Sequence, residues 1–188
     1  MLHGSNMVDR SLIETLKPIS SKKKYTLCRL TAILISIVAV GRTCFEVLPD
    51  WRNPNRGFEA YWIAKVLVAG NGYSFPSENR WLFDPVYNGS FHPTAWADPF
   101  YTFILAGIIR LFCNYHQLAA LIFNLILLLT IFLLTYHLGE CLISASAGVL
   151  SVLSLALIRD FPLTAGFMNN TVLASVMVLL SALGLMKF

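Results

Sequence analysis

Charged residues are scarce in this chain. Asp, Glu, Lys and Arg make up 13% of the 188 residues, whereas 56% of the residues are hydrophobic. An ordinary soluble domain carries about 25% charged residues. The shortage excludes a disordered tail, a fibrous repeat and most soluble enzymes, and it indicates a membrane protein.

The few cysteines lack the spacing of a redox pair or a zinc site. The four cysteines are far apart and form no C-x-x-C pair: Cys28, Cys44, Cys113 and Cys141. We interpret them as small apolar residues of membrane helices, while a disulfide at Cys44 stays open without a partner that can be named. The sequence also lacks a Gly-rich phosphate loop, H-E-x-x-H and G-x-S-x-G.

The net charge of +4 belongs to the N-terminal part of the chain. Residues 1–30 hold six basic and two acidic residues, whereas the remainder holds eight of each. The aromatic residues lie elsewhere, so this patch does not indicate a nucleic-acid partner. Lys22, Lys23 and Lys24 precede the first apolar run, and positive residues stay on the cytoplasmic side. We therefore predict a cytoplasmic N-terminus and an extracytoplasmic loop over residues 49–98.

The apolar runs predict an all-α fold, a polytopic transmembrane helical bundle with about five membrane segments. A basic cytoplasmic segment, residues 1–26, leads into a first transmembrane helix over residues 27–48. The long basic segment and the absence of an A-x-A site favour an uncleaved helix over a signal peptide. Residues 99–188 form a bundle of about four further segments. Their apolar runs are Phe100–Cys113, Leu118–Tyr136, Leu142–Ile158 and Thr171–Met186.

The links between these runs are short. Strict alternation of spans places Asn114–Gln117 inside, His137–Cys141 outside and Arg159–Asn170 inside. Runs of this length also leave half-spanning or tilted segments open.

The extracytoplasmic loop contains every tryptophan of the chain: Trp51, Trp62, Trp81 and Trp96. Tryptophan favours the membrane–water interface, so we expect this loop to lie on the membrane surface. Apolar residues at helical spacing from Phe58 to Ala69 predict a short interfacial helix. The segment Gly70-Asn71-Gly72 is typical of a helix end.

Two segments of this loop carry a resemblance to a known family. Residues 59–76 read E-x-x-x-I-A-x-x-L-x-x-G-x-G-Y-S-x-P, and residues 93–101 read P-T-A-W-A-D-P-F-Y. Both segments resemble the first loop of the GT-C superfamily of membrane glycosyltransferases, in its protein-mannosyltransferase-like and aminoarabinose-transferase-like branch. The run from Ile104 to Phe112 resembles the second span of that branch, and Asn124 matches a common asparagine.

The resemblance implies a function and a location. Such enzymes are multi-pass proteins of the plasma (inner) membrane. They transfer a sugar from a polyprenyl-phosphate donor to a lipid, glycan or protein acceptor on the outer face. They have more spans and run to several hundred residues. The chain would therefore be the N-terminal part of such an enzyme, with a C-terminal half or second subunit as a further partner.

The resemblance also assigns candidate site residues. The first-loop acid of the family is a catalytic base or a metal ligand, which makes Glu59 the candidate for both roles and a divalent metal ion a candidate cofactor. A carboxylate can deprotonate an acceptor hydroxyl, and cations such as Arg52 and Arg56 can stabilise a leaving phosphate. The alternative is that these charges are solvated or anchor the loop at the interface.

Further loop residues complete the predicted substrate-binding set. The aromatic residues Tyr61, Trp62 and Trp96 would shape the interfacial pocket. His92 could bind a metal or a phosphate, or be merely exposed. Asp98 stands where the family usually has proline. It is either an extra carboxylate near the site or the N-cap of the second span, with Pro99 as the first helical residue.

One departure from the family pattern favours a different function. Relatives often carry an acid before the final span, where this chain has Asn169 and Asn170. Asparagine forms hydrogen bonds but cannot act as a base. The alternative is a non-catalytic membrane partner or a carrier-lipid-binding or flippase subunit. A transporter is disfavoured, because the later spans have no charged residue at their centres and no inverted repeat is visible.

Overall fold

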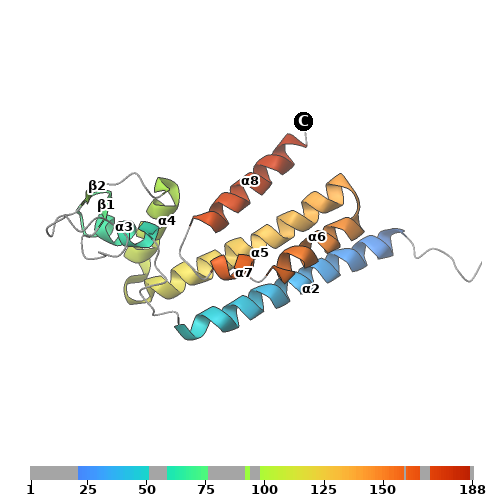
Figure 1. The fold of residues 1–188 in the computed structure, drawn as a ribbon, viewed down its shortest axis with the longest axis horizontal. Helices are drawn as coiled ribbons and strands as arrows, with labels where there is room; N and C mark the ends of the chain where they lie inside the picture. Colours follow the sequence, from blue (N-terminus) through green and yellow to red (C-terminus); the bar gives the residue numbers. More distant parts are fainter. Residues whose placement is uncertain are drawn as a thin grey trace, which may run out of the picture.

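The computed structural model describes residues 21–50, 59–75, 92–93, 98–158, 160–165 and 170–186. Apart from turns and one short antiparallel ladder, these residues are helical, as predicted for an all-α fold (Figure 1). The helices are α2 (Ser21–Val47), α3 (Glu59–Val68), α4 (Pro99–Phe112), α5 (His116–Leu142), α6 (Ala145–Leu157), α7 (Asp160–Thr164) and α8 (Thr171–Leu185). Two 3-10 turns, η1 (Leu48–Asp50) and η3 (Cys113–Tyr115), extend α2 and separate α4 from α5. The ladder pairs β1 (Ser74–Phe75) with β2 (His92–Pro93).

Two helical stretches are long and apolar enough, by length and composition, to cross a membrane: Lys22–Val47 and Pro99–Leu142. Helices α2 and α5 each have 27 residues. At about 1.5 Å per residue they measure roughly 40 Å, more than the hydrocarbon core of about 30 Å. Helix α2 begins at Ser21, so the three lysines lie in its first turn rather than before it.

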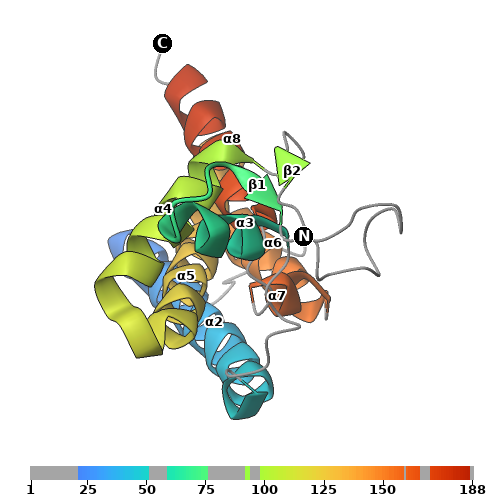
Figure 2. The same ribbon diagram turned by 90° about the vertical axis from the view of Figure 1, so that its left-hand side faces the viewer.

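The long helices pack antiparallel. Helix α5 runs antiparallel to α2, and α6 runs back along both of them (Figure 1). Helix α8 packs on α5, and the C-terminal end of α8 leans away from the bundle (Figures 1 and 2). Small residues of α2 allow this close approach, and the shared core is apolar. Its buried members are Ala32, Ala39, Leu128, Ile131, Phe132, Tyr136, Val152, Ala165, Val172 and Val176.

This packing decides which segments share an end of the bundle. The first turns of α2 lie beside the turn between α5 and α6, because Lys24 and Tyr25 line one hollow with residues 144–146. The C-terminal end of α2 lies at the other end, together with α3, α4 and η3 (Figure 1). Strict alternation placed Asn114–Gln117 on the same side as the N-terminus of α2. In the structure this segment lies at the opposite end of the bundle from the first turn of α2, because α4 folds onto α3 instead of running the length of the bundle (Figure 1). Its side of a membrane stays a prediction.

The links between the later segments also differ from the prediction. His137–Cys141 is not a link, because α5 continues to Leu142. Helix α5 ends at Leu142, and Ile143 is its C-cap. The Ser144 hydroxyl then caps α6 by accepting the amide hydrogen of Ala147 over 3.2 Å. The predicted link Arg159–Asn170 contains the short helix α7.

Glycines let α5 and α6 approach closely. A Cβ atom at Gly139 would lie 2.8 Å from the Cα of Gly148, and one at Gly148 would lie 2.6 Å from the carbonyl oxygen of Tyr136. Close approach at small residues is typical of helices that pack in a membrane. Gly139 therefore lies within α5 and serves as a contact point for α6.

This contact yields a stability prediction. We expect Gly148→Ala to destabilise the protein by about 1–3 kcal/mol, because the added methyl group overpacks the α5–α6 contact. The measurement is the midpoint of thermal unfolding in detergent. Gly107→Ala in α4 is the matched control, since a Cβ atom there meets nothing within 4 Å. Equal midpoints for the two variants would contradict the proposed contact.

Candidate functional site

Helix α3 forms where the sequence predicted it. The prediction was Phe58–Ala69, and the helix spans Glu59–Val68. Its end is a glycine turn: Gly70 and Gly72 have φ angles of +85° and +74°, which glycine adopts without steric cost. The amides of Gly70 and Asn71 close the last turn on carbonyls inside the helix. Glu59 is therefore the first residue of a defined helix.

Helix α3 is held against α4 by an apolar face. Ile63 and Ala64 are fully buried, and Ala60 and Val66 nearly so. Together with the start of α5 and one residue of α8, these two helices enclose a small second core (Figure 2). Its buried members are Ala60, Tyr61, Ala64, Tyr101, Leu105, Ala106, Ala120 and Leu173. The position of α3 is therefore fixed by packing on α4.

A hydrogen bond ties α3 to the start of α5. The Tyr61 hydroxyl lies 2.8 Å from Nε2 of His116, and the two rings are nearly parallel. The other ring nitrogen of His116, Nδ1, lies against the carbonyl oxygen of Cys113. A carbonyl oxygen can only accept, so Nδ1 carries the hydrogen, and in the neutral ring Nε2 accepts the proton of the Tyr61 hydroxyl.

Burial keeps Tyr61 in its donating form. Its side chain is only 1% exposed. Desolvation raises the pKa of Tyr61 above the ordinary value for tyrosine, and a hydrogen bond from Gln117 opposes this shift to a smaller extent. The phenol is therefore protonated at neutral pH and can donate to His116.

Trp62 and Lys65 form the more open edge of α3. Trp62 meets Tyr61 edge to face, with ring centroids 5.8 Å apart. The Lys65 ammonium lies 4.8 Å from the centroid of the Trp62 ring, a cation–π geometry. An aromatic ring and a cation therefore lie side by side, one and nearly two turns after Glu59.

Polar side chains join α4 to its neighbours. Asp98 caps α4 by accepting the amide hydrogen of Phe100 over 2.9 Å, so the N-cap interpretation of Asp98 is confirmed. Thr102 accepts a hydrogen bond from the Tyr73 hydroxyl over 3.2 Å. The buried Tyr101 donates to the buried Asn124 over 2.9 Å. Asn124 thus has a structural role between α4 and α5.

The remaining predicted site residues are described only in part. The ladder pairs His92 with Phe75. Because Phe75 follows α3 closely in the chain, the His92 backbone lies near the end of that helix. The side chains of His92 and Glu59, and the whole of Arg52, Arg56 and Trp96, lie outside the described residues. The structure therefore gathers Glu59, Tyr61, Trp62, His92 and Asp98 at one end of the bundle, as positions along the backbone.

Sequence reasoning missed His116. It stands in a predicted link and has no local motif, because its partner Tyr61 is 55 residues away. The cation–π pair of Lys65 and Trp62 has a weak local signal, their i, i+3 spacing. Within the described ranges, no group of three or more His, Cys, Asp or Glu side chains is arranged to hold a metal ion.

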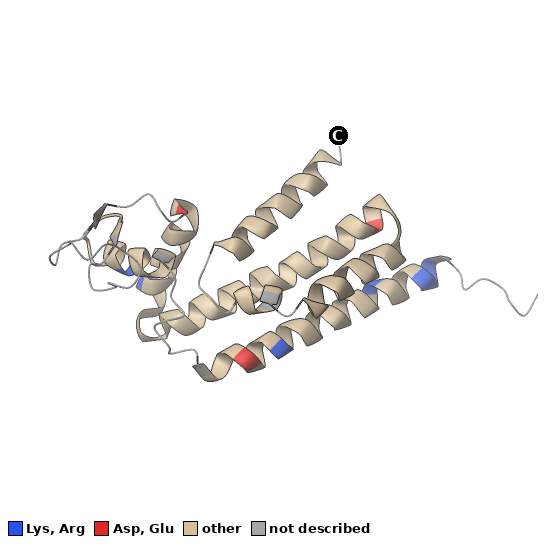
Figure 3. Cartoon of the chain, viewed as in Figure 1, with Lys and Arg blue, Asp and Glu red and all other residues tan. Residues whose placement is uncertain are grey.

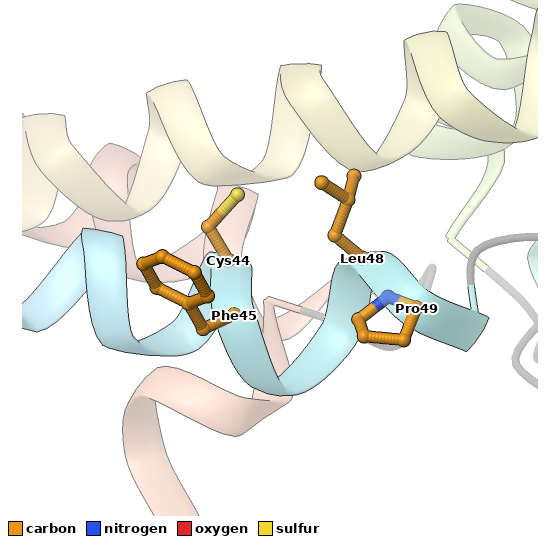
Figure 4. A pocket seen from close by; sticks show the side chains of 4 residues that line it. All are labelled: Cys44, Phe45, Leu48 and Pro49. Carbon is orange, nitrogen blue, oxygen red and sulfur yellow. The ribbon is translucent and has the colours of Figure 1, made fainter.

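An open apolar hollow of about 440 Å³ lies at the C-terminal end of α2. Its lining residues are Cys44, Phe45, Leu48 and Pro49. Cys44 and Leu48 point toward α5, whereas Phe45 and Pro49 lie in front of the ribbon in this view (Figure 4). Arg42 and Glu46 form an exposed ion pair over 3.0 Å in the same part of α2. The lining of the hollow is suited to contact with a hydrocarbon chain. The opposite charges of Arg42 and Glu46 nearby neutralise each other.

The Tyr61–His116 bond yields a second stability prediction. We expect Tyr61→Phe to lower the free energy of unfolding by about 1–3 kcal/mol, because His116 Nε2 loses its donor. Thermal unfolding in detergent measures the effect. Tyr115→Phe is the control, since Tyr115 is 62% exposed. An unchanged stability of the Tyr61 variant would show that the bond does not hold α3.

Comparison with known proteins adds no relative. No protein-family model matches this chain, and neither the curated proteins nor the solved structures contain a significant match.

Proposed function

We propose that this chain is an integral membrane protein with α2 and α5 as full spans. The exposed surface of these helices supports the proposal. Leu34 and Val38 of α2 are 62% and 63% exposed, and Ile126 of α5 is 58% exposed. Many other large apolar side chains of the described helices are exposed as well, and extensive exposed apolar surface is rare on soluble monomers. The shorter apolar helices α6 and α8 would complete a bundle of four membrane segments, with α4 remaining at one end.

The proposed orientation follows from charge. The lysines in the first turns of α2 favour the cytoplasm for their end of the bundle. The opposite end, with α3, α4 and the ladder, is then extracytoplasmic. The plasma membrane is the proposed location, with the N-terminus in the cytoplasm.

We propose that the extracytoplasmic end contributes to sugar transfer from a polyprenyl-phosphate donor, as in GT-C enzymes, to a lipid, glycan or protein acceptor. One observation carries the proposal. The segment that resembles the GT-C first loop is a helix that begins at Glu59 and is fixed to the end of the bundle by packing and by the Tyr61–His116 bond. A carrier with its tail in the bilayer presents its phosphosugar at this level.

In the proposed reaction, the acceptor hydroxyl attacks the anomeric carbon of the donor sugar. The Glu59 carboxylate takes the proton of that hydroxyl. The bond between the anomeric carbon and the phosphate oxygen breaks, and polyprenyl phosphate leaves with the electron pair. Arg52 and Arg56 would stabilise the charge on that phosphate.

The described contacts refine the other roles. Tyr61 is buried and donates to His116, so it positions α3 rather than touching substrate. Asp98 likewise positions α4 through its cap. Trp62, Trp96 and His92 remain the proposed contacts with the donor. Glu59 alone does not make a metal site, and the described residues gather no further ligands, so no step is assigned to a divalent ion.

A non-catalytic carrier-lipid-binding subunit is the second candidate. Asn169 and Asn170 stand where GT-C enzymes often carry an acid before the final span, and asparagine cannot act as a base. Such a protein would bind the carrier at the same end without breaking a bond. Binding of polyprenyl phosphate without sugar transfer would identify it.

The test is Glu59→Gln in the full chain, assayed in membranes with polyprenyl-phosphate mannose carrying a labelled sugar. We expect transfer to fall about 100-fold or more, because loss of a positioned base costs 10²–10⁴-fold. Glu140→Gln is the matched control, since Glu140 lies near the far end of α5 and bonds to Tyr136. Normal transfer by a well-expressed Glu59 variant would remove Glu59 from the reaction.

A further inference from the structure

A second hollow lies at the opposite end of the bundle from α3. It has a volume of about 250 Å³ and separates the first turns of α2 from the beginning of α6. Its lining residues are Lys24, Tyr25, Ser144, Ala145 and Ser146. In Figure 3 the basic segment at the start of α2 lies beside the turn that joins α5 to α6.

The hollow offers hydrogen-bond donors and no carboxylate. The Lys24 ammonium and the hydroxyls of Tyr25 and Ser146 have no hydrogen-bond or ion-pair partner among the described residues, and all three side chains are exposed. The oxygen of Ser144 accepts from Ala147, which leaves the proton of that hydroxyl free to donate. One ammonium and three hydroxyls around one hollow suit the oxygens of an anion.

The surrounding charge has the same sign. Lys22 and Lys23 precede Lys24 directly, and residues 1–30 carry the whole net charge of the chain. The nearest described acid along α5 is Glu140, whose carboxylate accepts from Tyr136 and lies 3.6 Å from His137. Glu140 therefore has its partners on α5, and it forms no ion pair with Lys22, Lys23 or Lys24.

Exposed apolar residues follow the lining residues along both helices. Leu27 and Leu30 of α2 are 62% and 59% exposed, and Leu150 of α6 is 62% exposed. These apolar side chains cannot bind a free phosphate ion, but they can pack against the acyl chains of a lipid. The combination of a cationic, hydroxyl-lined hollow with apolar flanks therefore fits an amphiphile.

We propose that this hollow binds the phosphate headgroup of an anionic phospholipid, with Lys24 as the contacting cation. Clusters of basic residues at the cytoplasmic end of a membrane helix are attracted to anionic lipids. The assignment of Lys24 is more specific, because Lys24 lines the hollow and the other two lysines do not. The inference rests on membrane embedding, which is part of the proposed function, but not on sugar transfer.

The test compares lipid binding to the full chain in detergent, by native mass spectrometry, with phosphatidylglycerol, phosphatidylcholine and inorganic phosphate as separate probes. We expect the wild type to prefer phosphatidylglycerol. We expect Lys24→Ala to weaken that binding about tenfold or more, as the loss of a charge-assisted hydrogen bond would. Lys23→Ala should weaken it no more than about fivefold, the effect of one lysine near an anionic surface.

Three results would overturn the proposal. Equal losses in Lys24→Ala and Lys23→Ala would show a diffuse charge effect rather than a site. Equal binding of phosphatidylcholine would remove the requirement for an anionic headgroup. Competition by inorganic phosphate as effective as that by the lipid would assign the hollow to a free anion. Both variants keep the proposed sugar-transfer residues, so these results are independent of the Glu59 test.

Discussion

The arrangement of the bundle depends on the turn at η3, between α4 and α5. Without it, Pro99–Leu142 would be one apolar helix of 44 residues, about 66 Å long. Cys113 breaks that helix with a φ angle of +43°, and among the described residues it is the one non-glycine with a positive φ. His116 supports the turn through Nδ1 and holds α3 through Nε2. One side chain therefore connects the break in the helix with the position of α3.

This turn gives the chain two chemically different ends. At one end, α4 folds onto α3, and the segment that resembles a GT-C first loop is fixed beside η3. At the other end, the lysines of α2 meet the start of α6 around a donor-lined hollow. The apolar length of α2 and α5 lies between them. A site for a phosphosugar carrier and a site for an anionic headgroup would thus lie on opposite faces of the membrane.

Local signals predicted local structure well. Apolar spacing and the glycines after residue 69 predicted α3 and its end, and the Asp98-Pro99 pair predicted the cap of α4. Contacts between distant residues had no such signal. Gly139 and its polar neighbours resembled a link, because its close contact with Gly148 is invisible in sequence. The run Phe100–Cys113 resembled a span, because hydropathy does not reveal that α4 folds onto α3. His116 was missed for the same reason, since its partner lies 55 residues away.

The central claim is that η3 shares an end with α3 and lies opposite the lysines. Single cysteines at positions 114 and 144, introduced by Asn114→Cys and Ser144→Cys into a chain freed of its own cysteines, test this claim directly. Both side chains are exposed. A membrane-impermeant maleimide applied to intact cells should label position 114, and it should reach position 144 only after permeabilisation. Labelling of both positions from the same side would contradict the account.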